Sequence, residues 1–186
     1  NWTDVVLGSR FTQLFTETKL LEQGASTKKH TAFFSNREQQ FDVNDVVKHL
    51  ASNTDSVTYS RGAVDGNSKT IYRGNIRVEK MARNCSGHQK ADNILLSQEA
   101  KCDAVPILEV SNDEISCSHG ATFSRVNDEH LFYLTSRGLD KDMARQTLVL
   151  GFFEKVLKDV PDSRVREAIS KIIKEKLSAE VSYVAN

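Results

Sequence analysis

The sequence predicts a mostly β protein whose strands are followed by a shorter α-helical region, and two observations carry this prediction. Up to about residue 126, short apolar runs alternate with Ser, Asn, Asp, Thr and Gly, and no long stretch repeats with helical spacing. Beyond residue 127, apolar residues recur every three or four positions, which is the period of an amphipathic helix. The chain therefore divides into a β part, residues 1–126, and a helical part, residues 127–186.

Short apolar runs mark the strands of the β part. The segment Tyr72–Val78 alternates most clearly, with apolar side chains at positions 72, 76 and 78 and polar ones at 73, 75 and 77. The further runs are Trp2–Leu7, Thr31–Phe34, Phe41–Val43, Ile94–Leu96 and Ile107–Val110. Many short strands with few hairpin signals are typical of a β-sandwich or of a parallel β-helix, and no fixed repeat length decides between them.

The first two helices of the helical part are predicted from their start and stop signals. Asn127 or Asp128 can cap a helix over Glu129–Arg137, and Gly138 suits the position just past its end. Asp140 can then cap a second helix.

Pro161 is expected to stop the second helix, and Asp162 or Ser163 to start a third, of which the last nine residues are expected to fray. The two helices carry apolar stripes, formed by Val149, Phe152, Phe153, Val156, Leu157 and Val160 in the second and by Val165, Ala168, Ile169, Ile172, Ile173 and Leu177 in the third. Packing on the β part is the usual way to bury such stripes, and docking on a partner is the alternative.

Composition excludes several classes of protein. Lys+Arg and Asp+Glu both number 25, so no basic excess indicates nucleic-acid binding, and no apolar run is long enough to span a membrane. The chain has no secretory signal, no P-loop and no GxGxxG, and it begins at Asn1, so we expect that it starts inside a longer protein. Its cysteines, Cys85, Cys102 and Cys117, cannot all pair, which favours reduced thiols in the cytosol.

The segment CSHGATF places a thiol and an imidazole, Cys117 and His119, two residues apart. In a strand, both would lie on the same face as Ile115 and Phe123 unless Gly120 introduces a bulge, so both would point to the apolar side. One interpretation is a histidine satisfied near the core beside an inert thiol. The other is a pair of ligands for iron or zinc, with the remaining ligands supplied elsewhere in the fold or by another chain.

Other candidate chemistry is weaker. Cys85 and His88 could form a second pair of ligands, although a loop without a ligand role is favoured, and Cys102 is interpreted as structural. A thiol hydrolase is disfavoured, because neighbours on one strand face stand side by side. A carbohydrate-cleaving β-helix would need converging carboxylates, whereas the acidic residues are scattered and Asp113–Glu114 is typical of a solvated turn.

Residues 93–153 resemble the SufB/SufD family of iron–sulfur cluster assembly proteins. The segments that carry the resemblance are Pro106–Glu109, Cys117–Thr122, Leu131–Leu134 and Ser136–Leu139. The resemblance implies a right-handed parallel β-helix over residues 1–126, followed by a C-terminal α-helical region over 127–186. It also implies a cytoplasmic scaffold that is not an enzyme.

The resemblance further implies two partners, a SufC-type ABC ATPase docked on the helical region and a SufB-type scaffold, or a second copy, paired through the β-helix. The residues expected to contact partners are Leu131, Phe132, Tyr133, Arg137, Gly138, Phe152 and Phe153. Gly120 stands where the SufB side carries Glu, so the sequence is similar to the SufD side.

On the SufD side a histidine that maps onto His119 is a candidate ligand for the nascent cluster. His119, with Cys117, would hold a transient Fe–S cluster at an inter-subunit site, and no cluster is expected to bind tightly to the isolated chain. The alternative is a stand-alone metal or Fe–S binding protein that uses Cys85, His88, Cys117 and His119.

Overall fold

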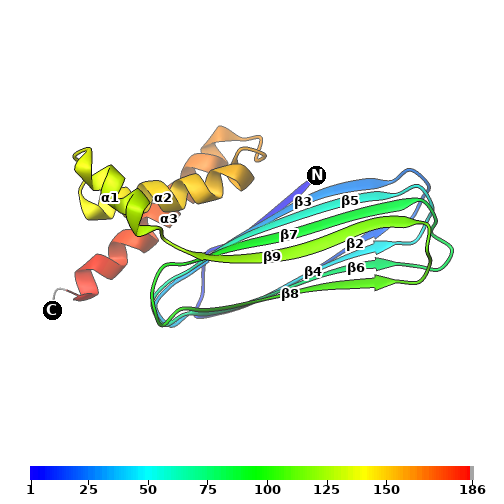
Figure 1. The fold of residues 1–186 in the computed structure, drawn as a ribbon, viewed down its shortest axis with the longest axis horizontal. Helices are drawn as coiled ribbons and strands as arrows, with labels where there is room; N and C mark the ends of the chain where they lie inside the picture. The colour runs from blue at the N-terminus through cyan, green and yellow to red at the C-terminus, as the bar shows by residue number, and fades with distance from the viewer. Residues whose placement is uncertain (185–186) are drawn as a thin grey trace.

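The computed structural model describes residues 1–184, with side chains described up to residue 178. The chain forms a flattened β-helix of two facing sheets, followed by helices that are grouped toward one end of the strands (Figure 1). The strands of the described part are β1 (Trp2–Val6), β2 (Phe11–Leu20), β3 (Ser26–Ser35), β4 (Gln40–His49), β5 (Asp55–Val64), β6 (Lys69–Val78), β7 (Cys85–Leu95), β8 (Lys101–Val110) and β9 (Ile115–Arg125). The β-helix implied by the resemblance is therefore confirmed, and the sandwich is excluded.

Successive strands alternate between the two sheets, so that each turn of the β-helix contributes one strand to each. The five-stranded sheet has the order β1-β3-β5-β7-β9, the four-stranded sheet has the order β2-β4-β6-β8, and all pairs are parallel. Ser26 pairs with Asp55 and Asp55 with Ser86, which are steps of 29 and 31 residues, from 55 − 26 and 86 − 55. Because the step varies with the length of each turn, no fixed repeat is visible in the sequence.

The interior of the β-helix is filled by alternate side chains of each strand. In β6 the side chains of Tyr72, Ile76 and Val78 are fully buried, as their alternation predicted. They belong to two interior clusters that also contain Phe33, Phe41, Val43, Val64, Ala82, Cys85, Ala91 and Ala100. Burial of these side chains stabilises the stacked turns by about 1.5–3 kcal/mol for each large apolar residue.

A charged network lies inside the β-helix among these apolar groups. The Lys29 ammonium, 2% exposed, forms ion pairs with Asp45 and with Asp4, the latter at 3.1 Å. Asp45 also accepts hydrogen bonds from Thr31 at 2.7 Å and Tyr72 at 3.2 Å. Burial, followed by the nearby Asp45 carboxylate, raises the pKa of the Tyr72 hydroxyl well above its usual value, so this phenol remains a donor.

The three helices begin where their caps predicted. The side chain of Asn127 caps α1 (Asp128–Ser136), that of Asp140 caps α2 (Lys141–Leu157), and Gly138 has a positive φ of 95° just beyond α1. The third helix, α3 (Ser163–Val184), starts at one of the two predicted residues. It continues to 184, so the predicted fraying is not seen up to that point, and residues 185–186 lie outside the described part.

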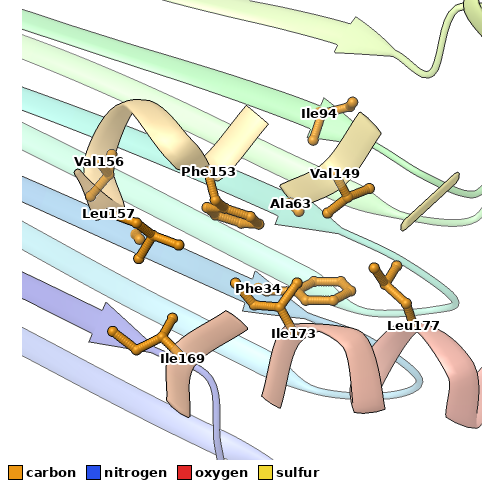
Figure 2. Close-up of a cluster of buried hydrophobic side chains, with 11 residues drawn as sticks. Phe34, Ala63, Ile94, Val149, Phe153, Val156, Leu157, Ile169, Ile173 and Leu177 are labelled. Carbon is orange, nitrogen blue, oxygen red and sulfur yellow. The ribbon is translucent and has the colours of Figure 1, made fainter. Parts of the chain in front are cut away.

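Helices α2 and α3 pack on the outer face of the five-stranded sheet, so intramolecular packing accounts for most of their apolar stripes. Figure 2 shows this cluster, in which Phe34, Ala63 and Ile94 from the sheet meet Phe153 and Ile173 from the helices. The Phe34 and Phe153 rings lie 6.5 Å apart between centroids. None of the helices within residues 1–184 is both long and apolar enough to cross a membrane.

Polar contacts also hold α2 on the five-stranded sheet. Arg61 of β5 donates to the carbonyl oxygen of Phe152 in α2 and, at 3.2 Å, to Asp92 of β7. Arg145 of α2 forms an ion pair with the buried Asp65, which follows β5. In contrast, α1 buries no residue, and among the helices and sheets its main contact is with α2.

Candidate functional site

Cys117 and His119 lie on β9, the last strand of the five-stranded sheet. Cys117 is in register with Gly87 of β7, and His119 is in register with Gln89. In the part of the chain that the structure describes, no strand pairs with the other edge of β9. Strands β8 and β9 are the last strands of the two sheets, and they form what we call the open end of the β-helix. The two candidate ligands therefore lie at this open end.

The Cys117 thiol points into the β-helix, as the alternation of β9 predicted. It packs against the interior cluster that contains Ile76 and Cys85. A Cβ atom added at Gly87 would lie 3.2 Å from its Sγ, so the glycine makes room for the thiol. Partial burial raises the pKa of the Cys117 thiol, so it is protonated at neutral pH, and a metal that bound it would have to displace the proton.

The imidazole of His119 is exposed, although it lies on the same interior-facing side of β9. Its register neighbour Gln89 reaches across the interior to Gly74 of β6, and paired residues of a parallel sheet point to the same face. His119 is exposed because no further turn of the β-helix lies above it in the described part. The interpretation of His119 as a satisfied core histidine is therefore wrong.

Cys85 and His88 do not form a second pair of ligands. They lie in strand β7 rather than in a loop, and they point to opposite faces. Cys85 is buried beside Thr54, whereas His88 is exposed and hydrogen-bonds the Ser118 hydroxyl at 2.8 Å. Among the described residues, no three or more His, Cys, Asp or Glu side chains are grouped to hold a metal ion.

Cys102 has the structural surroundings that the sequence indicated. It packs against the interior cluster of the β-helix, and burial raises its pKa to about 12. The thiol therefore stays protonated at neutral pH, which is the state expected of an inert, half-buried structural cysteine.

The predicted partner-binding residues fall into an exposed group and a packed group. On α1, Phe132 is 73% exposed and Tyr133 is 58% exposed, with the Arg137 guanidinium 5.3 Å from the Tyr133 ring centroid. Leu131 is half-buried. Met143, at the start of α2, is a further exposed apolar side chain, 55% exposed, which the sequence analysis did not single out.

Phe152 and Phe153 belong to the packed group. Phe152 is half-buried beneath the Arg61 guanidinium, which lies 4.9 Å from its ring centroid. Phe153 is fully buried in the cluster of Figure 2 and so cannot contact a partner directly.

Comparison with known proteins places this arrangement in a family. The family model described as SUF system FeS cluster assembly, SufBD core domain, matches residues 1–152, which include the whole β-helix, α1 and most of α2. The chain belongs to the SufBD family. Its C-terminal α3 lies beyond the matched region, so the cluster in Figure 2 joins the family core to a helix outside it.

Curated relatives agree with this membership. An iron–sulfur cluster assembly SufBD family protein of Staphylococcus aureus is 32% identical over 180 residues, which cover 97% of this chain and 38% of the relative. A SufBD family protein of Staphylococcus epidermidis has the same identity and coverage. This SufBD chain therefore spans about 38% of the length of the curated relatives it matches.

Proposed function

We propose that this SufBD chain is a cytoplasmic, non-enzymatic scaffold subunit that helps to hold a nascent Fe–S cluster at the open end of its β-helix. The observation that carries the proposal is the exposed imidazole of His119, on the interior-facing side of β9, whose outer edge pairs with no strand of the described part. A ligand in this position can supply only part of the coordination of a cluster. A second protein placed against β9 would supply the remaining ligands. Gly120, in place of the Glu of the SufB side, supports a SufD-like role.

The two edges at the open end differ in their ability to pair. At the two ends of β8, the Lys101 N–H donates to the Ser68 carbonyl just before β6, at 3.0 Å, and the Ser111 N–H donates to the Val78 carbonyl at the end of β6, at 3.1 Å. Odd-numbered N–H groups therefore face β6, and those of even-numbered residues of β8 point to its free edge. Pro106 is even-numbered and has no N–H, which interrupts that edge at its centre. Strand β9 has no proline, and we therefore assign pairing with a SufB-type scaffold, or with a second copy, to β9.

The chemistry of the two side chains suits a cluster that must be passed on. Thiolates are the usual ligands of Fe–S clusters, and histidine is an occasional substitute. The Cys117 thiol is packed in the interior and protonated, so His119 is the more accessible ligand of this chain. A cluster would thus depend on the partner for its other ligands, and movement of the two scaffolds by the ATPase would expose or release it.

His119→Ala tests the proposed site directly. In the assembly reconstituted anaerobically with a SufB-type scaffold and a SufC-type ATPase, we expect bound iron and sulfide to fall by at least about tenfold, because a ligand is lost. The matched control is Ser118→Ala, which changes the neighbouring residue on the opposite face of β9. Equal iron and sulfide contents in the His119→Ala and wild-type assemblies would rule out His119 as a ligand.

Helix α1 is the proposed dock for the SufC-type ATPase, because its Phe132 and Tyr133 side chains are mostly exposed and α1 has no buried residue. We expect Phe132→Asp to weaken binding of the ATPase by about tenfold or more, as measured by titration calorimetry. Val165→Asp, on an exposed part of α3, is the control. Point variants are preferable to removal of residues 127–186, which would uncover the apolar face of the five-stranded sheet. Unchanged affinity of Phe132→Asp would place the dock elsewhere.

A further inference from the structure

Lys29, Asp45 and Asp4 bring one amine and two carboxyl groups together between the facing sheets. Lys29 lies on β3 and Asp45 on β4, which are strands of opposite sheets, and their side chains are 2% and 1% exposed. The Lys29 nitrogen contacts Oδ1 of Asp45 directly and lies 3.1 Å from Oδ2 of Asp4 on β1. An amine, which can act as a nucleophile, is thus held against a carboxyl group, and neither has a part in the cluster site proposed above.

The Lys29–Asp45 pair lies away from solvent, beside aromatic side chains of the interior. Tyr72, whose hydroxyl contacts Asp45, is fully buried, and its ring stacks on the buried Phe33 ring at 6.3 Å between centroids. Burial disfavours charged forms, so transfer of a proton from an ammonium to a carboxylate costs less in such an interior than in water. The products of this transfer are a carboxylic acid and a neutral, desolvated amine, which is the nucleophilic form of lysine.

The two oxygens of the Asp45 carboxyl group have different partners. Oδ2 accepts hydrogen bonds from the hydroxyl groups of Thr31 at 2.7 Å and Tyr72 at 3.2 Å. These donors polarise the carboxyl group and stabilise the negative charge that Oδ2 gains when an amine attacks the carboxyl carbon. Oδ1 contacts the Lys29 nitrogen and the Thr16 hydroxyl, the latter at 2.5 Å, so it is placed to take a proton and leave.

We propose that Lys29 and Asp45 react with each other to form an isopeptide bond, with Asp4 as the general base. The Lys29 ammonium first gives a proton to Oδ1 of Asp45, and the neutral amine then attacks the carboxyl carbon. Asp4 takes a proton from the attacking nitrogen and passes it to Oδ1, the bond between the carboxyl carbon and Oδ1 breaks, and one water leaves. A C–N bond replaces a C–O bond, so the step needs neither an oxidant nor a cofactor.

The bond joins the two sheets covalently within the first turns of the β-helix. The ion pair described above is the arrangement from which it forms, and the product replaces a buried ammonium and a buried carboxylate by one neutral amide. Burying an amide costs less than burying two charges. The Asp4 side chain is 15% exposed, so the released water has a route to solvent. The inference is independent of the proposed function, since it needs no Fe–S cluster.

The mass of the purified protein tests the inference. Under denaturing conditions, we expect the intact chain to be lighter than its sequence requires by one water. Trypsin should then release residues 29–37 and 38–48 as one branched peptide, joined through Lys29 and Asp45. The joined peptide is decisive, because cyclisation at Asp65–Gly66 would also remove one water but would link no two peptides. An intact chain of full mass, or a 38–48 peptide found only in its unlinked form, would overturn the inference.

Three variants assign the roles of the residues. Lys29→Arg keeps the positive charge but should have its full mass, because a guanidinium does not attack a carboxyl group. Asp4→Asn, with its fold checked by circular dichroism, should contain at least about tenfold less joined peptide than wild type collected at the same time after induction, because the general base is lost. Asp42→Asn, on the outer side of β4, is the matched control and should lose one water as wild type does. A wild-type amount of joined peptide in Asp4→Asn would overturn the role of Asp4.

Discussion

Lys29→Met is expected to lower the free energy of unfolding by about 3–5 kcal/mol, because it removes one partner of a buried ion pair. The Lys29 ammonium is the cation between Asp45, 1% exposed, and Asp4. Without it, two carboxylates remain inside the β-helix with hydrogen-bond donors but no compensating charge. Urea unfolding followed by circular dichroism would measure the change.

The control for this prediction is Lys19→Met, which removes an exposed ammonium paired with Glu17 on the outer side of β2. We expect little change there, since exposed ion pairs contribute little to stability. The double variant Lys29→Met with Asp45→Leu should recover part of the loss, because an apolar pair replaces the unpaired charge. Equal stabilities of Lys29→Met and Lys19→Met would contradict the assignment of Lys29 as a buried, paired cation.

Much of the fold could be predicted from the sequence because its signals are local. The alternation over Tyr72–Val78 and the caps Asn127 and Asp140 depend on neighbouring residues, and each is found as predicted. The Lys29–Asp45 pair could not be predicted, because its partners lie on facing sheets and meet only once the strands are stacked. For the same reason, sequence patterns alone left a sandwich and a β-helix open.

The candidate site shows the same division between local and non-local information. Alternation placed Cys117 and His119 on one face, but the exposure of His119 depends on β9 being an edge, which no local pattern reveals. The register that pairs His119 with Gln89 spans 30 residues, from 119 − 89, which is one turn of this β-helix and which no local pattern reveals.

Position 92 links the helical region to the strand that carries the site. The Asp92 carboxylate accepts hydrogen bonds from Arg61 at 3.2 Å and from Thr122 at 2.7 Å. Arg61 also holds the Phe152 carbonyl of α2, and Thr122 lies three residues beyond His119 on β9. A displacement of α2, such as the proposed docking of an ATPase would cause, would therefore reach β9 through a short polar row as well as through the packed cluster.

The second large effect is expected from Phe153→Ala, which removes a ring from the packed cluster. We expect a loss of about 3–5 kcal/mol in the free energy of unfolding, because the change leaves a cavity between α2 and the sheet. The Phe153 ring is fully buried and contacts both Phe34 and the Phe152 ring, whose centroid lies 5.4 Å away. Urea unfolding with tryptophan fluorescence and circular dichroism would measure it.

Phe132→Ala is the matched control, since the same side chain is removed from an exposed position of α1. It should leave stability almost unchanged while it weakens ATPase binding, whereas Phe153→Ala should do the reverse because its ring is not accessible to a partner. If Phe153→Ala instead keeps wild-type stability, the helices are not held by this cluster. If both variants weaken ATPase binding equally, the dock extends from α1 into α2, and packing and docking share one surface.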